Sequence, residues 1–203
     1  MLLGLVADIH EAVGPLALAL ARFRDLGVEQ VVNLGDAFDR LGPGSRPVAD
    51  LMTDCGAVGV WGNHDYGLCG AVSEPLRVKA GERVIAFMSG MRPQVTLDGC
   101  RFSHVEPWLD PNQVEDLWYY DGPPESAGAA GRSFAAHPER FFFVGHFHCW
   151  LAVTPAGRLD WDGSRPLDLA SVGRALVVVA PVAGGWAATF DTRSATLTPV
   201  WCG

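Results

Sequence analysis

Three short apolar runs in the first 65 residues alternate with two segments of helical spacing, and this alternation limits the possible folds. The runs cover residues 2–8, 28–36 and 57–65, and the helical segments cover residues 14–27 and 45–56. Strands that alternate with helices form sheets with parallel strands. The sequence therefore predicts an α/β fold whose first half is a parallel sheet.

Terminal signals support both helices. Gly27 follows the last periodic residue of the first helix and is the expected C-cap. Ser45 is the expected N-cap of the second helix, with Pro47 in its first turn.

Beyond residue 80 the sequence is typical of short strands separated by turns, with little helix. Residues 83–90 are expected to form a strand, and residues 111–120 a short helix. Residues 121–133, rich in Gly, Pro, Ala and Ser, are expected to form a flexible loop. The pair Gly184-Gly185 is expected to be a hairpin turn in a C-terminal β-meander.

Composition limits the class of protein. With 203 residues and 49% hydrophobic content, the chain is expected to be one domain over residues 1–203. A net charge of −8 argues against stable nucleic-acid binding, which needs a basic surface. A small anionic substrate remains possible, because bound divalent ions reverse the local charge of an acidic site.

The sequence also predicts a cytoplasmic protein without a membrane partner. No run reaches the roughly 18 apolar residues of a membrane span, and the N-terminus lacks the features of a signal peptide. Five scattered cysteines without a Cys-x-x-Cys pair suit reduced thiols. The oligomeric state stays open.

Polar motifs follow the predicted strands. Asp8, Asp36 and Asn63 each stand where a strand ends, and sites in open α/β sheets lie beyond the carboxyl ends of the strands. The motifs are Asp8-x-His10, Asp36-x-x-Asp39-Arg40, Asn63-His64-Asp65, His104 and His146-x-His148.

Carboxylate, imidazole and amide donors suit Mn²⁺, Fe, Zn²⁺ or Co²⁺. In an extended segment, residues two apart point the same way, so each Asp/His-x-His pair is expected to reach one ion. Seven ligands exceed the need of one ion, and Asp36 is the natural carboxylate to bridge two. Two ions about 3.5–4 Å apart can clamp a phosphoryl group and generate hydroxide at neutral pH.

Taken singly, each motif has an ordinary structural explanation. Asn63-His64-Asp65 between Gly62 and Gly67 suits a turn, and the other histidines could be surface residues. Five motifs of one donor chemistry at successive strand ends favour a metal site instead. His137 matches no motif and is expected to be an ordinary surface histidine.

The ordered series of motifs, from residue 8 to 148, resembles the calcineurin-like metallophosphoesterase superfamily, and in particular its small bacterial and archaeal phosphodiesterase-type members. Residues 103–120 and 169–176 are also similar to segments of those members. The resemblance implies a four-layer α/β/β/α sandwich of two mixed β-sheets flanked by helices.

The resemblance implies two metal ions, with Mn²⁺ expected first and Fe, Zn²⁺, Ni²⁺ or Co²⁺ as alternatives. By match, the first ion takes Asp8, His10, Asp36 and His148, and the second takes Asp36, Asn63, His104 and His146.

The resemblance also implies in-line attack by a hydroxide bridging the ions, with His64 as general acid or charge stabiliser. Asp39 matches an acid that orients this histidine in the phosphoprotein-phosphatase branch, and Asp65 is a second candidate. Arg40 matches a phosphate-gripping arginine, although an exposed, solvated Arg40 is the alternative. Trp61 stands before the Gly62 motif where an arginine is usual, so one phosphate contact is missing.

The expected function is therefore hydrolysis of a phosphodiester or phosphomonoester bond in a small phosphorylated substrate. The small size and the His146-x-His148 motif favour diesters, and the Asp39-Arg40 pair favours monoesters. A non-catalytic scaffold with the same fold is the alternative, and a nuclease of the superfamily would need added domains. Trp108, Trp118 and Trp150 lie near the motifs, either as a stacking wall for a nucleoside or as packing.

Overall fold

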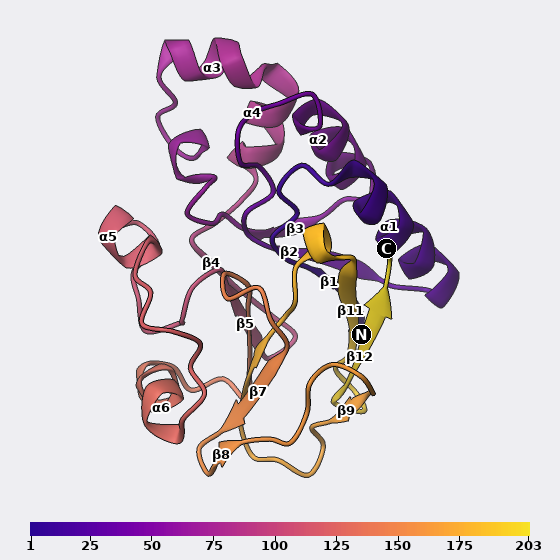
Figure 1. Ribbon diagram of the computed structural model, residues 1–203, viewed down its shortest axis with the longest axis vertical. Coiled ribbons are helices and arrows are strands. Elements are labelled where there is room, and N and C mark those ends of the chain that lie inside the picture. Colours follow the sequence, from indigo (N-terminus) through magenta and orange to yellow (C-terminus); the bar gives the residue numbers. More distant parts are fainter.

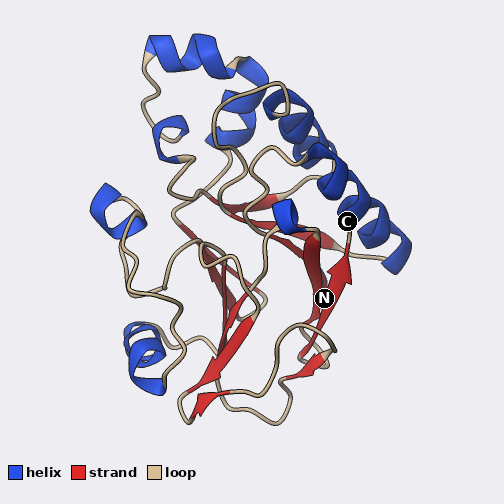
Figure 2. Cartoon of the chain, in the orientation of Figure 1, coloured by secondary structure: helices blue, strands red, loops and turns tan.

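The computed structural model describes all 203 residues and shows two six-stranded mixed sheets packed face to face, with helices on both outer surfaces (Figures 1 and 2). This is the expected four-layer α/β/β/α sandwich. The first sheet has the order β3-β2-β1-β11-β12-β9 and the second β4-β5-β6-β10-β7-β8.

The first sheet contains the three predicted N-terminal strands in parallel, joined by antiparallel C-terminal strands. Its strands are β1 (Leu2–Val6), β2 (Gln30–Leu34), β3 (Val58–Val60), β9 (Leu167–Asp168), β11 (Trp186–Asp191) and β12 (Thr196–Trp201). The strands of the second sheet are β4 (Gln94–Leu97), β5 (Cys100–Ser103), β6 (Phe141–Val144), β7 (Leu151–Thr154), β8 (Gly157–Arg158) and β10 (Ala175–Val178).

Helices cover the outer face of each sheet (Figure 1). Those on the side of the first sheet are α1 (Val13–Leu26), α2 (Ser45–Asp54), α3 (Glu74–Ala80) and α4 (Glu82–Ser89). Those on the side of the second are α5 (Val114–Leu117) and α6 (Ala127–Ala136), and the short 3₁₀ helices are η1 (Tyr66–Leu68) and η2 (Val182–Gly184).

The core fills the spaces between these layers. Strand β6 shows how, because Phe141 and Phe143 pack into the cluster between the sheets while Phe142 and Val144 face α6. A strand that is covered on both faces has no need of polar alternation, which explains the unbroken apolar run Phe141–Val144.

Two elements beyond residue 80 differ from the prediction. Residues 83–90 are expected as a strand, but most of them form α4, where the buried Val84, Ile85, Phe87 and Met88 recur at helical spacing. Residues 121–133 are expected as a loop, but from Ala127 the chain forms α6. The Ser126 side chain caps this helix by accepting a hydrogen bond from the Ala129 N–H at 3.0 Å.

Three local expectations have separate outcomes. Gly27 is confirmed as a left-handed C-cap of α1, with φ at 73°. Ser45 is not the N-cap of α2, since it lies within the helix and its hydroxyl donates to Glu11 and the Gly42 carbonyl. The Gly184-Gly185 pair is not a hairpin turn, because β10 and β11 lie in different sheets.

None of the helices combines the length and the apolar character needed to cross a lipid bilayer. All five cysteines are free thiols.

Candidate metal centre

Three parallel strands deliver the first ligands to one edge of the first sheet. Asp8 follows β1, Asp36 follows β2 and Asn63 follows β3, and all three are buried. The loops after β1 and β2 run together, since the His10 N–H donates to the Asp36 carbonyl at 3.0 Å. The parallel register therefore brings together side chains that lie 27 to 55 residues apart in the sequence.

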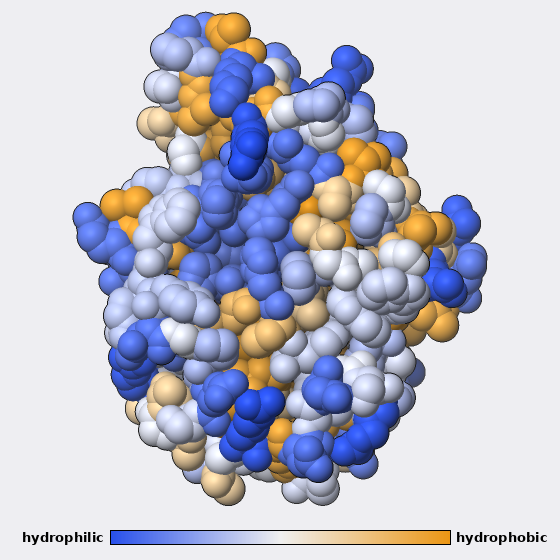
Figure 3. Space-filling view, in the orientation of Figure 1, coloured by the Kyte–Doolittle hydropathy of each residue, from blue (hydrophilic) through white to orange (hydrophobic).

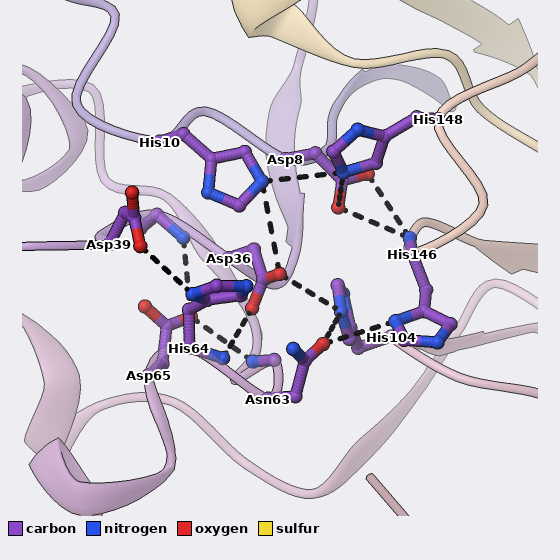
Figure 4. Close-up of polar contacts among 12 residues, drawn as sticks. Asp8, His10, Asp36, Asp39, Asn63, His64, Asp65, His104, His146 and His148 are labelled. Carbon is purple, nitrogen blue, oxygen red and sulfur yellow. Dashed lines mark hydrogen bonds and ion pairs between the residues drawn. The ribbon is translucent and has the colours of Figure 1, made fainter. Parts of the chain in front are cut away.

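The second sheet supplies the remaining histidines. His104 follows β5, while His146 and His148 follow the adjacent parallel strand β6. Figure 4 shows these side chains pointing toward Asp8, Asp36 and Asn63 from the opposite sheet. In the space-filling view, hydrophilic residues gather in the middle of the face above these strand ends (Figure 3).

One group of donors surrounds Asp8. His148 Nε2 lies 3.3 Å from Asp8 Oδ1 and 3.3 Å from His10 Nε2. His10 Nε2 also lies 3.9 Å from Asp36 Oδ2. The ligand atoms of Asp8, His10 and His148 are within 4.8 Å of one another, which is close enough for one ion.

A second group surrounds Asn63. Its Oδ1 lies 2.9 Å from His104 Nε2 and 3.0 Å from His146 Nδ1. His104 Nε2 is also 3.3 Å from Asp36 Oδ2, so the Asp36 carboxylate borders both groups. His104 Nδ1 must carry a proton because it donates to the Leu34 carbonyl at 2.9 Å, and this leaves Nε2 as a ligand. The residues present thus fit two ions, and the donor set is oxygen and nitrogen.

The prediction that each Asp/His-x-His pair serves one ion is wrong for the second pair. His148 joins Asp8 and His10, whereas His146 joins Asn63. The premise of an extended segment holds for neither pair, because His146 and His148, like the first pair, have positive φ. Asp8, His10 and Asp36 are also left-handed, a strained conformation that clusters at functional sites.

In the second group, Asp36 and His104 shift each other's pKa. Burial alone would raise the pKa of Asp36, but the adjacent His104 lowers that pKa to about 2. Burial alone would lower the pKa of His104, but the Asp36 carboxylate outweighs it and raises the pKa to about 9. Burial lowers the pKa of His146 to about 4. Without metal, His104 is therefore the proton carrier of this group near neutral pH.

We expect Mn²⁺ affinity at the second group to rise with pH. An ion must displace the proton from His104, whose metal-free pKa is about 9, while His146 is already neutral. The apparent association constant should therefore increase about tenfold per pH unit between pH 6.5 and 8.5. Titrating metal-stripped protein and measuring free Mn²⁺ by electron paramagnetic resonance tests this, and a pH-independent affinity would contradict it.

His64 stands beside the two groups and its ring is held by Asp39. Its backbone N–H donates to Asp36 Oδ1 at 2.9 Å, and its Nδ1 lies 3.0 Å from Asp39 Oδ1. Asp39 lies against Nδ1, and this leaves Nε2 as the ring nitrogen that Asp39 does not engage (Figure 4). The His64 ring lies edge-on to the His10 ring, with centroids 5.2 Å apart.

Asp65, the second candidate for orienting His64, has a different role. Its carboxylate is fully buried and accepts hydrogen bonds from the backbone N–H groups of Ala37, Phe38 and Gly62. Burial and the neighbouring Asp36 raise its pKa to about 7, whereas the three N–H donors favour the ionised form. Asp65 therefore ties the loop after β2 to the loop after β3.

Arg40 points away from the ligands. Its side chain is 90% exposed, and its one ion pair joins Nε to Asp39 Oδ2 at 3.5 Å. This is the solvated placement that the sequence left as an alternative. His137 is half-buried at the end of α6, with its ring bonded to the Pro107 carbonyl at 2.8 Å.

Glu11 is a residue that the sequence analysis missed. Its carboxylate accepts hydrogen bonds from Leu41 N at 2.7 Å, Gly42 N at 3.1 Å and Ser45 Oγ at 2.9 Å. These bonds hold the loop that carries Asp39 against the loop after β1. The available signal was an acidic residue directly after the Asp8-x-His10 motif.

Two glycines allow the ligands to approach the backbone closely. A Cβ at Gly62 would lie 2.1 Å from Asp36 Oδ1, and a Cβ at Gly35 would lie 2.5 Å from His104 Nδ1. Gly35 also has φ at +95°, where other residues are strained. The motif glycines are therefore required by packing around the ligands.

Gly62→Ala is expected to disrupt the metal centre. The added methyl group must displace the Asp36 carboxylate, and a shift of about 1 Å can cost about 10²-fold in rate. Metal content and phosphoesterase rate should fall together. Gly14→Ala in α1 is the matched control, because a Cβ there meets no atom within 4 Å. Full metal content in Gly62→Ala would contradict the prediction.

The chain is similar to known proteins in sequence and in fold. The family model described as "Calcineurin-like phosphoesterase superfamily domain" matches residues 1–159. An uncharacterised protein of Methanocaldococcus jannaschii is 31% identical over 184 residues, covering 78% of this chain and 67% of that protein.

Two solved structures share the fold. A metallophosphoesterase from Sphaerobacter thermophilus has a TM-score of 0.79 at 21% identity, covering 100% of this chain and 89% of that one. A structure described as a novel archaeal phosphodiesterase has a TM-score of 0.59 at 14% identity, covering 99% of each chain.

Proposed function

The chain belongs to the calcineurin-like phosphoesterase superfamily and is a metal-dependent phosphoric ester hydrolase, and from this premise we propose that its substrates are phosphodiesters. One observation carries the assignment of phosphoester hydrolysis to this site, and the choice of diesters is argued below. Seven donor side chains from five strand ends converge in two groups, with His64 beside them and its ring held by Asp39.

The proposed ligand sets follow the two groups of side chains. The first ion is held by Asp8, His10, Asp36 and His148, and the second by Asp36, Asn63, His104 and His146. When bound, the ions stabilise charge on the phosphoryl oxygens and lower the pKa of water. The oxygen and nitrogen donors support Mn²⁺ as the ion.

In this proposal His64 protonates the leaving oxygen. Asp39 accepts a hydrogen bond from Nδ1–H, which fixes the ring and directs the opposite nitrogen, Nε2, toward the substrate. Asp39 is thus a positioning residue, and Glu11 supports it by holding its loop.

The distribution of positive charge favours diesters over monoesters. A monoester dianion carries one more negative charge than a diester and gains more from an arginine clamp. Arg40 is 90% exposed and pairs with Asp39, and Trp61 stands at the other position expected for arginine. Trp61 donates its ring N–H to the Pro111 carbonyl at 3.2 Å, which keeps it in the loop packing.

We also propose the domain organisation, the compartment and the partner of the protein. Both sheets contribute ligands to one centre and share one core, which supports residues 1–203 acting as a single domain. Five free cysteines support a reducing compartment such as the cytoplasm. The net charge of −8 supports a small phosphorylated substrate rather than a nucleic acid as the stable partner.

Metal-stripped protein tests the function directly. Mn²⁺, Ni²⁺, Zn²⁺ and Mg²⁺ are added back separately, and hydrolysis of bis(p-nitrophenyl) phosphate is compared with that of p-nitrophenyl phosphate. We expect restored turnover, highest with Mn²⁺ and with a higher kcat/KM for the diester. A higher kcat/KM for the monoester would overturn the diester assignment. Two bound ions without turnover on either ester would indicate a narrow physiological substrate, and the absence of any bound metal would favour the scaffold alternative.

A further inference from the structure

Three tryptophans near the motifs have different surroundings. Trp150 packs against Trp161 and Trp186, with ring centroids 5.4 and 6.0 Å away. Trp108 packs against Tyr119 at 5.5 Å and lies under the Arg132 guanidinium at 4.0 Å. Trp118 is different, because 53% of it is exposed. Packing explains the first two rings, and it does not explain the third.

Trp118 lies on the side of the proposed proton donor. Its ring centroid is 5.2 Å from that of His64, with the ring planes at 53°. In the proposed reaction, His64 contacts the leaving oxygen, so whatever is attached to that oxygen lies next to Trp118. An exposed indole at this place is a surface on which a flat ring can stack.

Tyr120 extends the same aromatic edge along the centre. It is 62% exposed, and its ring lies 5.9 Å from the rings of both His146 and Phe147. The segment after α5 therefore places one exposed aromatic ring beside His64, that of Trp118, and a second beside His146, that of Tyr120.

The segment is built to hold these rings outward. Leu117 is fully buried with Val105 and Leu109, and Tyr119 turns inward onto Trp108. The backbone N–H of Trp118 donates to the Val114 carbonyl at 3.0 Å, and this hydrogen bond closes the end of α5. The alternation from residue 117 to 120 fixes Leu117 and Tyr119 in the packing and leaves the rings of Trp118 and Tyr120 exposed.

We propose that Trp118 and Tyr120 form an aromatic subsite for the base of a nucleoside attached to the scissile phosphodiester, with Trp118 stacking on the base of the leaving group. The inference rests on the proposed function, since it takes His64 to mark the leaving-group side. Stacking recognises the face that all bases share, so the subsite selects for a base and tolerates any of the four.

The test uses two substrates that share a leaving oxygen. Adenosine 2′,3′-cyclic phosphate is compared with the 2′,3′-cyclic phosphate of 1-O-methylribose, which lacks the base. We expect kcat/KM to be about 5- to 100-fold higher for the adenosine substrate. Trp118→Ala should lose most of this advantage, measured as the ratio of kcat/KM for the two substrates, while Trp118→Phe should retain part of it.

Trp201→Ala is the matched control. Trp201 is 50% exposed and packs on Trp186, so its removal should leave the preference for the base unchanged. A second measurement needs no turnover: saturation-transfer NMR of adenosine with metal-stripped protein should show binding that Trp118→Ala weakens.

The outcomes separate the two proposals. Equal rates on both substrates, or an undiminished preference in Trp118→Ala, would overturn the aromatic subsite and leave the phosphodiesterase intact. A change in oligomeric state in Trp118→Ala would instead make this ring part of an interface, which also overturns the subsite. Failure to hydrolyse any diester would overturn the proposed function, and the adenosine binding measurement would still decide the subsite.

Discussion

Replacing His64 with alanine should lower kcat by about 10²- to 10⁴-fold while both metal ions remain bound. The reason is that the His64 ring transfers a proton in the proposed mechanism, whereas only its backbone N–H contacts the proposed ligand Asp36, at 2.9 Å. The substitution removes the ring and keeps the backbone bond. Steady-state kinetics on a diester of an alkyl alcohol, together with metal analysis of the same preparation, measures both quantities.

The leaving group provides a sharper criterion. If His64 donates a proton, the loss should be largest for esters of alkyl alcohols and smallest for p-nitrophenyl esters, whose leaving oxygen needs little protonation. His137→Gln is the control, because that residue lies apart from the centre and glutamine can still donate to the Pro107 carbonyl. An equal loss for both kinds of ester would contradict the role as proton donor.

Asp36→Asn should have the largest effect on the centre itself. Its carboxylate borders both ligand groups, at 3.3 Å from His104 Nε2 and 3.9 Å from His10 Nε2. The amide cannot supply two anionic oxygens, so we expect at most one ion per chain and a loss in kcat of about 10³-fold or more, since charge stabilisation by metal is worth several kcal/mol. Metal content and kinetics together measure this.

The same substitution should change the titration of His104. Without the adjacent negative charge, nothing offsets its burial, so the pKa of His104 should fall from about 9. NMR of the histidine ring in metal-free protein reports this directly. Asp25→Asn is the control, because Asp25 is exposed and pairs only with Arg24. Two bound ions and full activity in Asp36→Asn would show that Asp36 does not bridge.

Sequence alone was sufficient for the first half of the fold. The apolar runs that end at Asp8, Asp36 and Asn63 are strands β1, β2 and β3, and the helices between them are α1 and α2. This worked because each signal is local: an apolar run, a helical period, a C-capping glycine. It failed where local signals conflict, as in α4, whose Val84 and Ile85 favour a strand while the spacing of the buried residues is helical.

Sequence also identified which side chains meet, because parallel strands bring their carboxyl ends to one edge of the sheet. Tertiary structure decided how they pair. His146 and His148 follow the same strand but lie in different groups. The loop held by Glu11 places Asp39 against the His64 ring, whereas Asp65 accepts hydrogen bonds from the backbone.

The exposure of the Trp118 ring could not be predicted from the sequence either, because nothing in the sequence distinguishes Trp118 from the packed Trp108. Donor chemistry and periodicity belong to each segment of the chain. The partner of a side chain depends instead on how loops from different strands cross, and that is settled only when the two sheets pack against each other.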